Sequence, residues 1–140
     1  MEIRVANQKD IVDLSNKFQG VKNVIWADDI NSYLIIAEEK SEIEGFAFVF
    51  RRIIPAPVGE CYEDFINVID VLDNKNKGIG TLMVKKIIET ARLNCSIQVR
   101  AYCDIDNTSS HRLWLKNGFG ISPVKMNDGK ICGTFVTYRL

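Results

Sequence analysis

A short segment from Lys75 to Thr81 constrains the fold of this chain more than any other stretch. It follows an apolar run over residues 65–72 and precedes an amphipathic pattern over residues 79–91. This order predicts a strand that enters a tight turn and then a helix. The first turn of a helix has unpaired backbone N–H groups and a partial positive charge. Because the segment also contains two glycines and two lysines, we predict a phosphate-binding turn.

The spacing of Gly78 and Gly80 disfavours the two commonest nucleotide-binding motifs. A P-loop requires a lysine directly after its last glycine, and Thr81 occupies that position. A dinucleotide-binding fingerprint requires a third glycine where Met83 stands, and it lies early in a βαβ unit rather than in mid-chain. A nucleotide-binding domain therefore remains an alternative of lower rank than the functions considered below.

The turn instead resembles the pyrophosphate loop of the GNAT N-acetyltransferase superfamily, whose pattern is Gln/Arg-x-x-Gly-x-Gly/Ala. Three residues fill that pattern: Lys75, Gly78 and Gly80. Lysine at the first position is a departure from the family, although the family uses mainly main-chain donors there.

A second segment, residues 107–119, is similar to a later helix of the same superfamily, with the pattern Asn-x-x-Ala-x-x-x-Tyr-x-x-x-Gly-Phe. Asn107 can cap that helix, and Gly118 can adopt the left-handed conformation that ends it. The distance between the two motifs accommodates one helix and one strand. Together they cover about residues 60–120.

Hydrophobic periodicity and turn residues give the remaining elements. We expect strands over residues 2–6, 33–37, 43–54, 60–72, 96–103, 119–126 and 131–140. We expect helices over residues 8–18 and 79–93 and in the second motif, with a short helix or a loop over 21–31.

The resemblance implies an α/β (α+β) fold in a single domain over residues 1–140, with a mixed, mostly antiparallel sheet of six or seven strands flanked by about four helices. The strands before the turn and after its helix would splay apart, and acetyl-CoA would lie in the gap. A backbone N–H near Ile69 to Val71 would face the thioester carbonyl, and no metal is required. The predicted acetyl-CoA contacts are Ile69, Asp70, Val71, Lys75, Asn76, Lys77, Gly78, Ile79, Gly80, Thr81, Asn107, His111 and Trp114.

The length and composition are those of one globular domain: the chain has 140 residues, of which 46% are hydrophobic and 26% are charged. No apolar stretch approaches the ~18 residues of a membrane span, and Met1 leads straight into a strand pattern, so we expect neither a membrane anchor nor a cleaved leader. The four cysteines lack the spacing of a zinc site or a disulfide framework, which is typical of a cytoplasmic protein.

The charge is unevenly divided. Residues 1–70 hold 7 Lys and Arg against 13 Asp and Glu, whereas residues 71–140 hold 11 against 5. A uniformly basic nucleic-acid-binding surface is therefore not expected. The division is consistent with one half facing an anionic cofactor, and equally with solvated faces. We leave a homodimer open.

The implied reaction is transfer of an acetyl group to the primary amine of a small molecule or peptide. Asp64 is the first candidate for the general base and Glu63 the second, because a carboxylate beside an apolar strand is suited to accept a proton. Solvated structural roles are equally open for both. Asp70 is a further candidate, as a base or as a structural group.

Trp114 stands where the family usually has a tyrosine that protonates the departing sulfur, and an indole N–H is too weak an acid for that step. Tyr62 and Tyr102 are candidate substitutes. The alternative is a catalytically weak or inactive acyl-CoA-binding sensor or interaction module of the same fold.

The acceptor is not specified by these motifs. Trp26, Asp28 and Asp29 would suit a cationic amine, whereas Arg51 and Arg52 would favour a carboxylate on the acceptor.

Overall fold

The computed structural model describes residues 1–17, 32–54, 61–72 and 78–140. In chain order the elements are β1 Glu2–Val5, α1 Gln8–Lys17, β2 Ser32–Glu39, β3 Glu42–Ile53, β4 Tyr62–Val71, α3 Ile79–Leu93, β5 Gln98–Asp104, α4 Thr108–Lys116, β6 Gly120–Lys125 and β7 Ile131–Arg139. The bounds of every predicted strand agree with these to within two residues. The described residues contain three helices, fewer than the four expected. The predicted helix or loop over residues 21–31 lies outside them.

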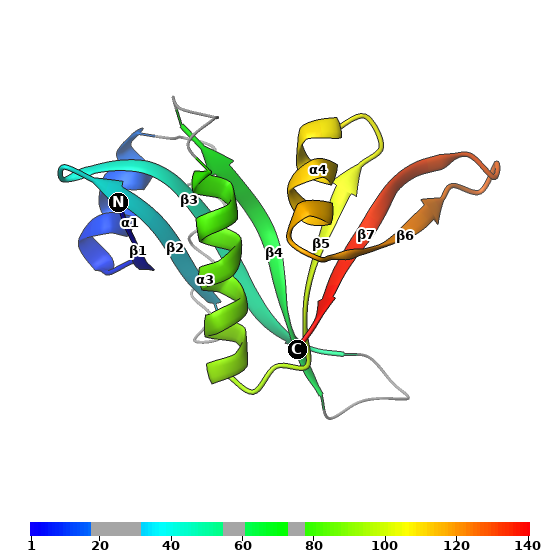
Figure 1. The fold of residues 1–140 in the computed structure, drawn as a ribbon, viewed down its shortest axis with the longest axis horizontal. Helices are drawn as coiled ribbons and strands as arrows, with labels where there is room; N and C mark the ends of the chain where they lie inside the picture. The colour runs from blue at the N-terminus through cyan, green and yellow to red at the C-terminus, as the bar shows by residue number, and fades with distance from the viewer. Residues whose placement is uncertain (18–31, 55–60, 73–77) are drawn as a thin grey trace.

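The seven strands form one sheet in the order β1-β2-β3-β4-β5-β7-β6 (Figure 1). Neighbouring strands are antiparallel except for β4 and β5, which are parallel because α3 returns the chain to the same end of the sheet. The predicted mixed, mostly antiparallel sheet is thus confirmed.

The strands β4 and β5 pair over only part of their length. Their four residue pairs end at Ile66 and Ala101, although β4 continues to Val71 and β5 to Asp104. Figure 1 shows the two strands diverging beyond the paired region, so that the sheet opens as a V. The predicted splay between these strands is confirmed.

Helix α3 packs on one face of the sheet and α1 on the other (Figure 1). The buried residues of α3 recur at intervals of three and four, which places them on one side of the helix: Ile79, Met83, Val84, Ile87, Ile88 and Ala91. They form the larger core with residues of β2 to β5 and β7. A smaller cluster, centred on Leu14, Phe46 and Phe48, lies beneath α1.

A β-bulge interrupts β4 at Asn67. Two adjacent residues of β3 pair with Ile66 and Val68, so Asn67 between them has no partner on β3. The extra residue shifts the alternation of side chains. As a result Ile66 before the bulge and Ile69 and Val71 after it all pack against the α3 core. The bulge therefore lies at the point where β4 leaves β5.

Candidate functional site

A cavity of about 500 Å³ lies where the sheet opens, among the end of β4, the start of α3 and one side of α4. Its lining residues are Ile69, Asp70, Val71, Gly78, Gly80, Thr81, Asn107, Ser109, Ser110, Arg112, Leu113 and Lys116. The structure thus brings both sequence motifs and the splayed end of β4 to one cavity.

The start of α3 presents its backbone to this cavity. Gly78 precedes the helix with a φ of 71°, a conformation that glycine adopts without steric cost, and no side chain of the described residues caps the helix start. The first turn also contains no acidic residue that would offset the positive end of the helix dipole. The side chain of Ile79 is buried in the core, so this residue can contribute only its backbone. Lys75, Asn76 and Lys77 lie outside the described residues.

Helix α4 forms the opposite wall. The side-chain oxygen of Asn107 accepts a hydrogen bond of 3.1 Å from the Ser110 N–H, which confirms the predicted cap. Arg112 and Lys116 line the cavity as well, and the sequence reasoning missed them. Their spacing of four residues places them on the same side of a helix as the cavity-lining Leu113, and this pattern could have identified them.

His111 and Trp114, both predicted contacts, are not among the residues that line the cavity. His111 lies within hydrogen-bonding distance of the Asn107 carbonyl oxygen, 2.9 Å from Nδ1, and of Thr134 Oγ1, 2.8 Å from Nε2. The Trp114 side chain is only 2% exposed and packs on Phe119, with ring centroids 5.0 Å apart. Both residues hold α4 in place rather than face the cavity.

A model of the family described as the GNAT acetyltransferases matches residues 12–119. The chain belongs to the GNAT acetyltransferase family. No curated protein sequence matches it.

Several solved structures share the fold of this GNAT acetyltransferase along its whole length. A ribosomal-protein-alanine N-acetyltransferase from Brucella melitensis is 21% identical, with a TM-score of 0.72 and 100% of each chain covered. The acetyltransferase yncA from Salmonella typhimurium, solved with its cofactor acetyl-CoA, is 18% identical, with a TM-score of 0.74 over 99% of this chain and 92% of that one. Arabidopsis thaliana NAA60 in complex with acetyl-CoA is 14% identical, with a TM-score of 0.72 and 99% of each chain covered.

In this acetyltransferase the first candidate base, Asp64, is fully buried on the α3 side of β4. Its Oδ2 accepts a hydrogen bond of 2.5 Å from the Tyr33 hydroxyl, and its Oδ1 accepts one of 2.5 Å from Ser96 Oγ. It does not line the cavity. Asp64 is therefore buried beside an apolar strand, as expected, but both of its oxygens accept hydrogen bonds from protein hydroxyl groups.

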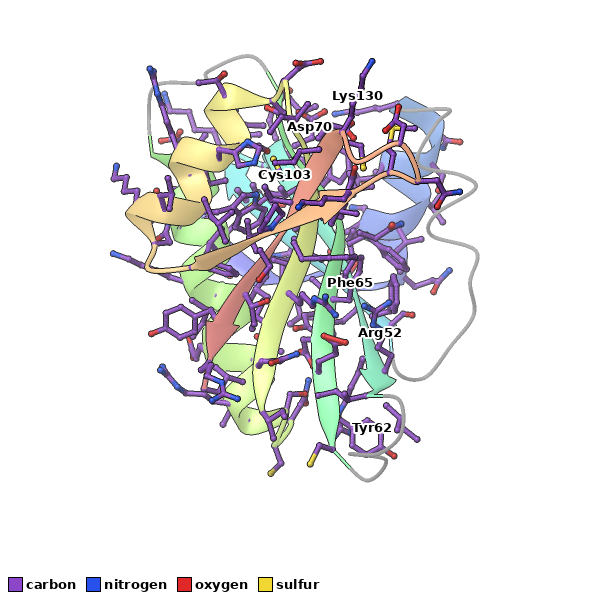
Figure 2. The ribbon with its side chains drawn as sticks, turned by 90° about the vertical axis from the view of Figure 1, so that its right-hand side faces the viewer. Arg52, Tyr62, Phe65, Asp70, Cys103 and Lys130 are labelled. Carbon is purple, nitrogen blue, oxygen red and sulfur yellow. The ribbon has the colours of Figure 1, made fainter. Side chains whose placement is uncertain are left out.

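The second candidate, Glu63, points to the opposite face of the sheet and is only 1% exposed. Its carboxylate accepts hydrogen bonds from Arg52 Nε at 3.1 Å and from Gln98 Nε2 at 3.2 Å. The remaining candidate, Asp70, is exposed and is the only carboxylate among the described residues that line the cavity. Figure 2 shows Asp70 at the open end of β4, far above Arg52.

The two tyrosines considered as proton donors face away from the cavity. The Arg51 guanidinium lies 3.9 Å from the ring centroid of Tyr62 at the paired end of β4, shown at the bottom of Figure 2. The Tyr102 hydroxyl is directed at β7, where it lies 3.7 Å from Cys132 Sγ and against Gly133. Trp26, Asp28 and Asp29, the residues considered for binding a cationic acceptor, lie outside the described residues.

None of the described helices has the length and apolar character needed to cross a membrane. The four cysteines, Cys61, Cys95, Cys103 and Cys132, are free thiols.

Proposed function

We propose that this GNAT acetyltransferase transfers the acetyl group of acetyl-CoA to a primary amine, with the cofactor in the cavity between β4, α3 and α4. The observation that carries this proposal is the end of β4–β5 pairing at Ile66 and Ala101, directly beside a cavity that both motifs line. Two structures of the same fold, NAA60 and yncA, contain acetyl-CoA.

The charges of the cavity suit a diphosphate. The uncapped start of α3 supplies backbone N–H donors, and Gly78 and Gly80 leave them accessible. Arg112 and Lys116 add two cations from α4, against the single carboxylate of Asp70 among the described lining residues. We assign the pyrophosphate to the α3 start on this basis.

The splayed end of β4 suits the pantetheine arm. The four pairs with β5 end at Ile66, so the backbone groups of residues 67–71 that point away from β3 have no strand partner among the described residues. An extended amide chain can take the place of the missing strand. Because the bulge lies at Asn67, we propose the N–H of Asn67 or Val68 as the oxyanion donor, in place of one near Ile69 to Val71. One preorganised donor of this kind contributes roughly 3–4 kcal/mol to the stability of the transition state.

Transfer of the amine proton to water fits the structure better than its transfer to either predicted base. The Asp64 and Glu63 carboxylates are buried, and both oxygens of each accept hydrogen bonds from protein groups. Trp114 lies in the core and cannot protonate the departing sulfur. We therefore propose that solvent removes the proton of the ammonium group and returns a proton to the thiolate.

The decisive experiment measures thiol release from acetyl-CoA over a panel of primary amines, together with calorimetric titration of CoA. Amine-dependent thiol release and micromolar CoA binding are expected. CoA binding without turnover of any amine would instead favour the acyl-CoA-binding module. Tighter binding of ATP or NAD than of CoA would overturn the cofactor assignment.

A further inference from the structure

The sheet face opposite α3 carries a cluster of arginines stacked on aromatic rings, which we call the arginine face: Arg52, Phe65, Arg100 and Phe135. The Arg52 guanidinium lies 4.1 Å from the ring centroid of Phe65, and the Arg100 guanidinium lies 3.9 Å from that of Phe135. Stacking of this kind fixes the plane of a guanidinium and leaves its N–H edge directed outward. Figure 2 shows Arg52 and Phe65 side by side on β3 and β4.

The arginine face lies immediately before the divergence of β4 and β5. Phe65 pairs with Arg100 in the parallel ladder, and the next pair, Ile66 with Ala101, is the last one. The proposed path of the pantetheine arm ends at this point of the sheet. An acceptor that attacks the thioester from the face opposite α3 would therefore contact Arg100 and Phe65.

The two arginines retain donors that no described residue uses. Arg100 forms no ion pair or side-chain hydrogen bond within the described residues. Arg52 binds Glu63 through Nε alone, and its two terminal nitrogens have no acceptor there. Glu63 is buried and its oxygens already accept hydrogen bonds from Arg52 and Gln98, so it offers little to a cationic ligand. The face thus presents guanidinium donors rather than a carboxylate.

We infer that the acceptor is a primary amine that also carries a carboxylate, an amino acid in chemical class, bound through Arg100 and Arg52 with its apolar side against Phe65 and Phe135. This inference rests on the proposed function, because it places the acceptor beside the thioester end of the cavity. Guanidinium groups bind carboxylates through paired, charge-assisted hydrogen bonds. The unused N–H groups of the two half-buried arginines match that chemistry, with the Phe65 ring between them and the Phe135 ring on the far side of Arg100.

The test compares acceptors that differ only in the carboxylate: L-phenylalanine, L-phenylalaninamide and 2-phenylethylamine, with spermidine as a polycationic acceptor. The wild-type enzyme is expected to acetylate L-phenylalanine with a kcat/KM about tenfold to a hundredfold above those of the other three. Arg100→Gln is expected to abolish this preference by raising KM for L-phenylalanine, and to leave the affinity for CoA unchanged. Arg100→Lys should retain part of the preference because it retains the charge.

Arg92→Gln on α3 is the matched control, because Arg92 lies away from the arginine face and should leave the preference intact. Thermal melting establishes that each variant is folded. A preference for 2-phenylethylamine or spermidine, or an unchanged preference in Arg100→Gln, would overturn the inference.

A measurement of acceptor binding distinguishes a failure of this inference from a failure of the proposed function. L-phenylalanine and 2-phenylethylamine are titrated calorimetrically into the wild-type protein saturated with CoA, and tighter binding of the amino acid is expected. If no amine is acetylated, the proposed function fails, and the binding comparison still decides whether the arginine face recognises a carboxylate.

Discussion

The hydroxyl of Tyr33 donates a hydrogen bond of 2.5 Å to Asp64, which joins β2 to β4 across the intervening strand β3. Ser96, just after α3, donates to the other oxygen of the same carboxylate. Burial, and then the hydrogen bond and the charge of Asp64, raise the pKa of Tyr33 well above its usual value of 10.0. The hydrogen bonds among Tyr33, Asp64 and Ser96 thus link β2, β4 and the segment that follows α3.

The raised pKa of Tyr33 predicts a loss of stability at alkaline pH. Above about pH 10 the unfolded chain loses the tyrosine proton while the folded chain keeps it. The unfolded state then binds fewer protons, so the free energy of unfolding falls by about 1.4 kcal/mol per pH unit through this group. Urea denaturation at several pH values should show a steeper alkaline decline for the wild type than for Tyr33→Phe. Parallel declines would show that Tyr33 ionises equally in both states.

Asp64→Asn is expected to reduce stability without altering the pH dependence of catalysis. The amide gives the two hydroxyl donors a single carbonyl acceptor, and one lost charge-assisted hydrogen bond costs about 1–3 kcal/mol. Because Asp64 does not face the cavity, the profile of kcat/KM against pH should keep its shape. Ser96→Ala, which removes one donor and keeps the carboxylate, is the control. If Asp64→Asn loses the acidic limb of the profile and Ser96→Ala keeps it, Asp64 is the base.

Gly80→Asp is expected to weaken CoA binding at least tenfold, or about 1.4 kcal/mol, because it places a negative charge beside the proposed pyrophosphate. Gly80→Ala is the steric control. Its Cβ would lie 3.4 Å from Leu113 Cδ1, an ordinary contact, so CoA affinity should change little. Calorimetric titration measures both variants. Equal CoA affinities for folded Gly80→Asp and wild-type protein would contradict the placement of the diphosphate.

Gly78→Ala is expected to weaken both folding and CoA binding, because a residue with a Cβ is strained by roughly 1–2 kcal/mol at a φ of 71°. Gly129 offers a matched control in the β6–β7 turn, with a φ of 83° and, as at Gly78, no atom within 4 Å of an added Cβ. Gly129→Ala should lose similar stability and keep its CoA affinity. Gly78→Asn should be milder than Gly78→Ala, since asparagine tolerates this conformation better. Identical CoA affinities in the two alanine variants would remove Gly78 from the site.

Local patterns predicted most of the fold. Helix α3 occupies residues 79–93, as expected, because its apolar spacing and the preceding glycine turn are both encoded within about twenty residues. The cap at Asn107 is predictable for the same reason, since the capping side chain and the backbone N–H that donates to it are three residues apart. Seven of the predicted acetyl-CoA contacts line the cavity, namely Ile69, Asp70, Val71, Gly78, Gly80, Thr81 and Asn107.

The candidate bases show where local patterns were insufficient. Glu63 and Asp64 are adjacent in sequence, yet alternation along a strand places their carboxylates on opposite faces, each with different partners. Those partners, Arg52 and Ser96, lie 11 and 32 residues away in the chain. Likewise, no nearby residue marks the bulge at Asn67, because it is defined by pairing with β3.

The sequence by itself determined the order of the elements, the uncapped glycine start of α3 and the family to which the chain is similar, since each depends on residues close together in the chain. Only the tertiary structure decided which carboxylates are buried, that Trp114 belongs to the core, and that Arg52 and Arg100 share one face near the divergence of β4 and β5. The physical reason is that burial and charge pairing arise between strands that are distant in sequence, and the register of those strands is fixed only when the whole sheet packs.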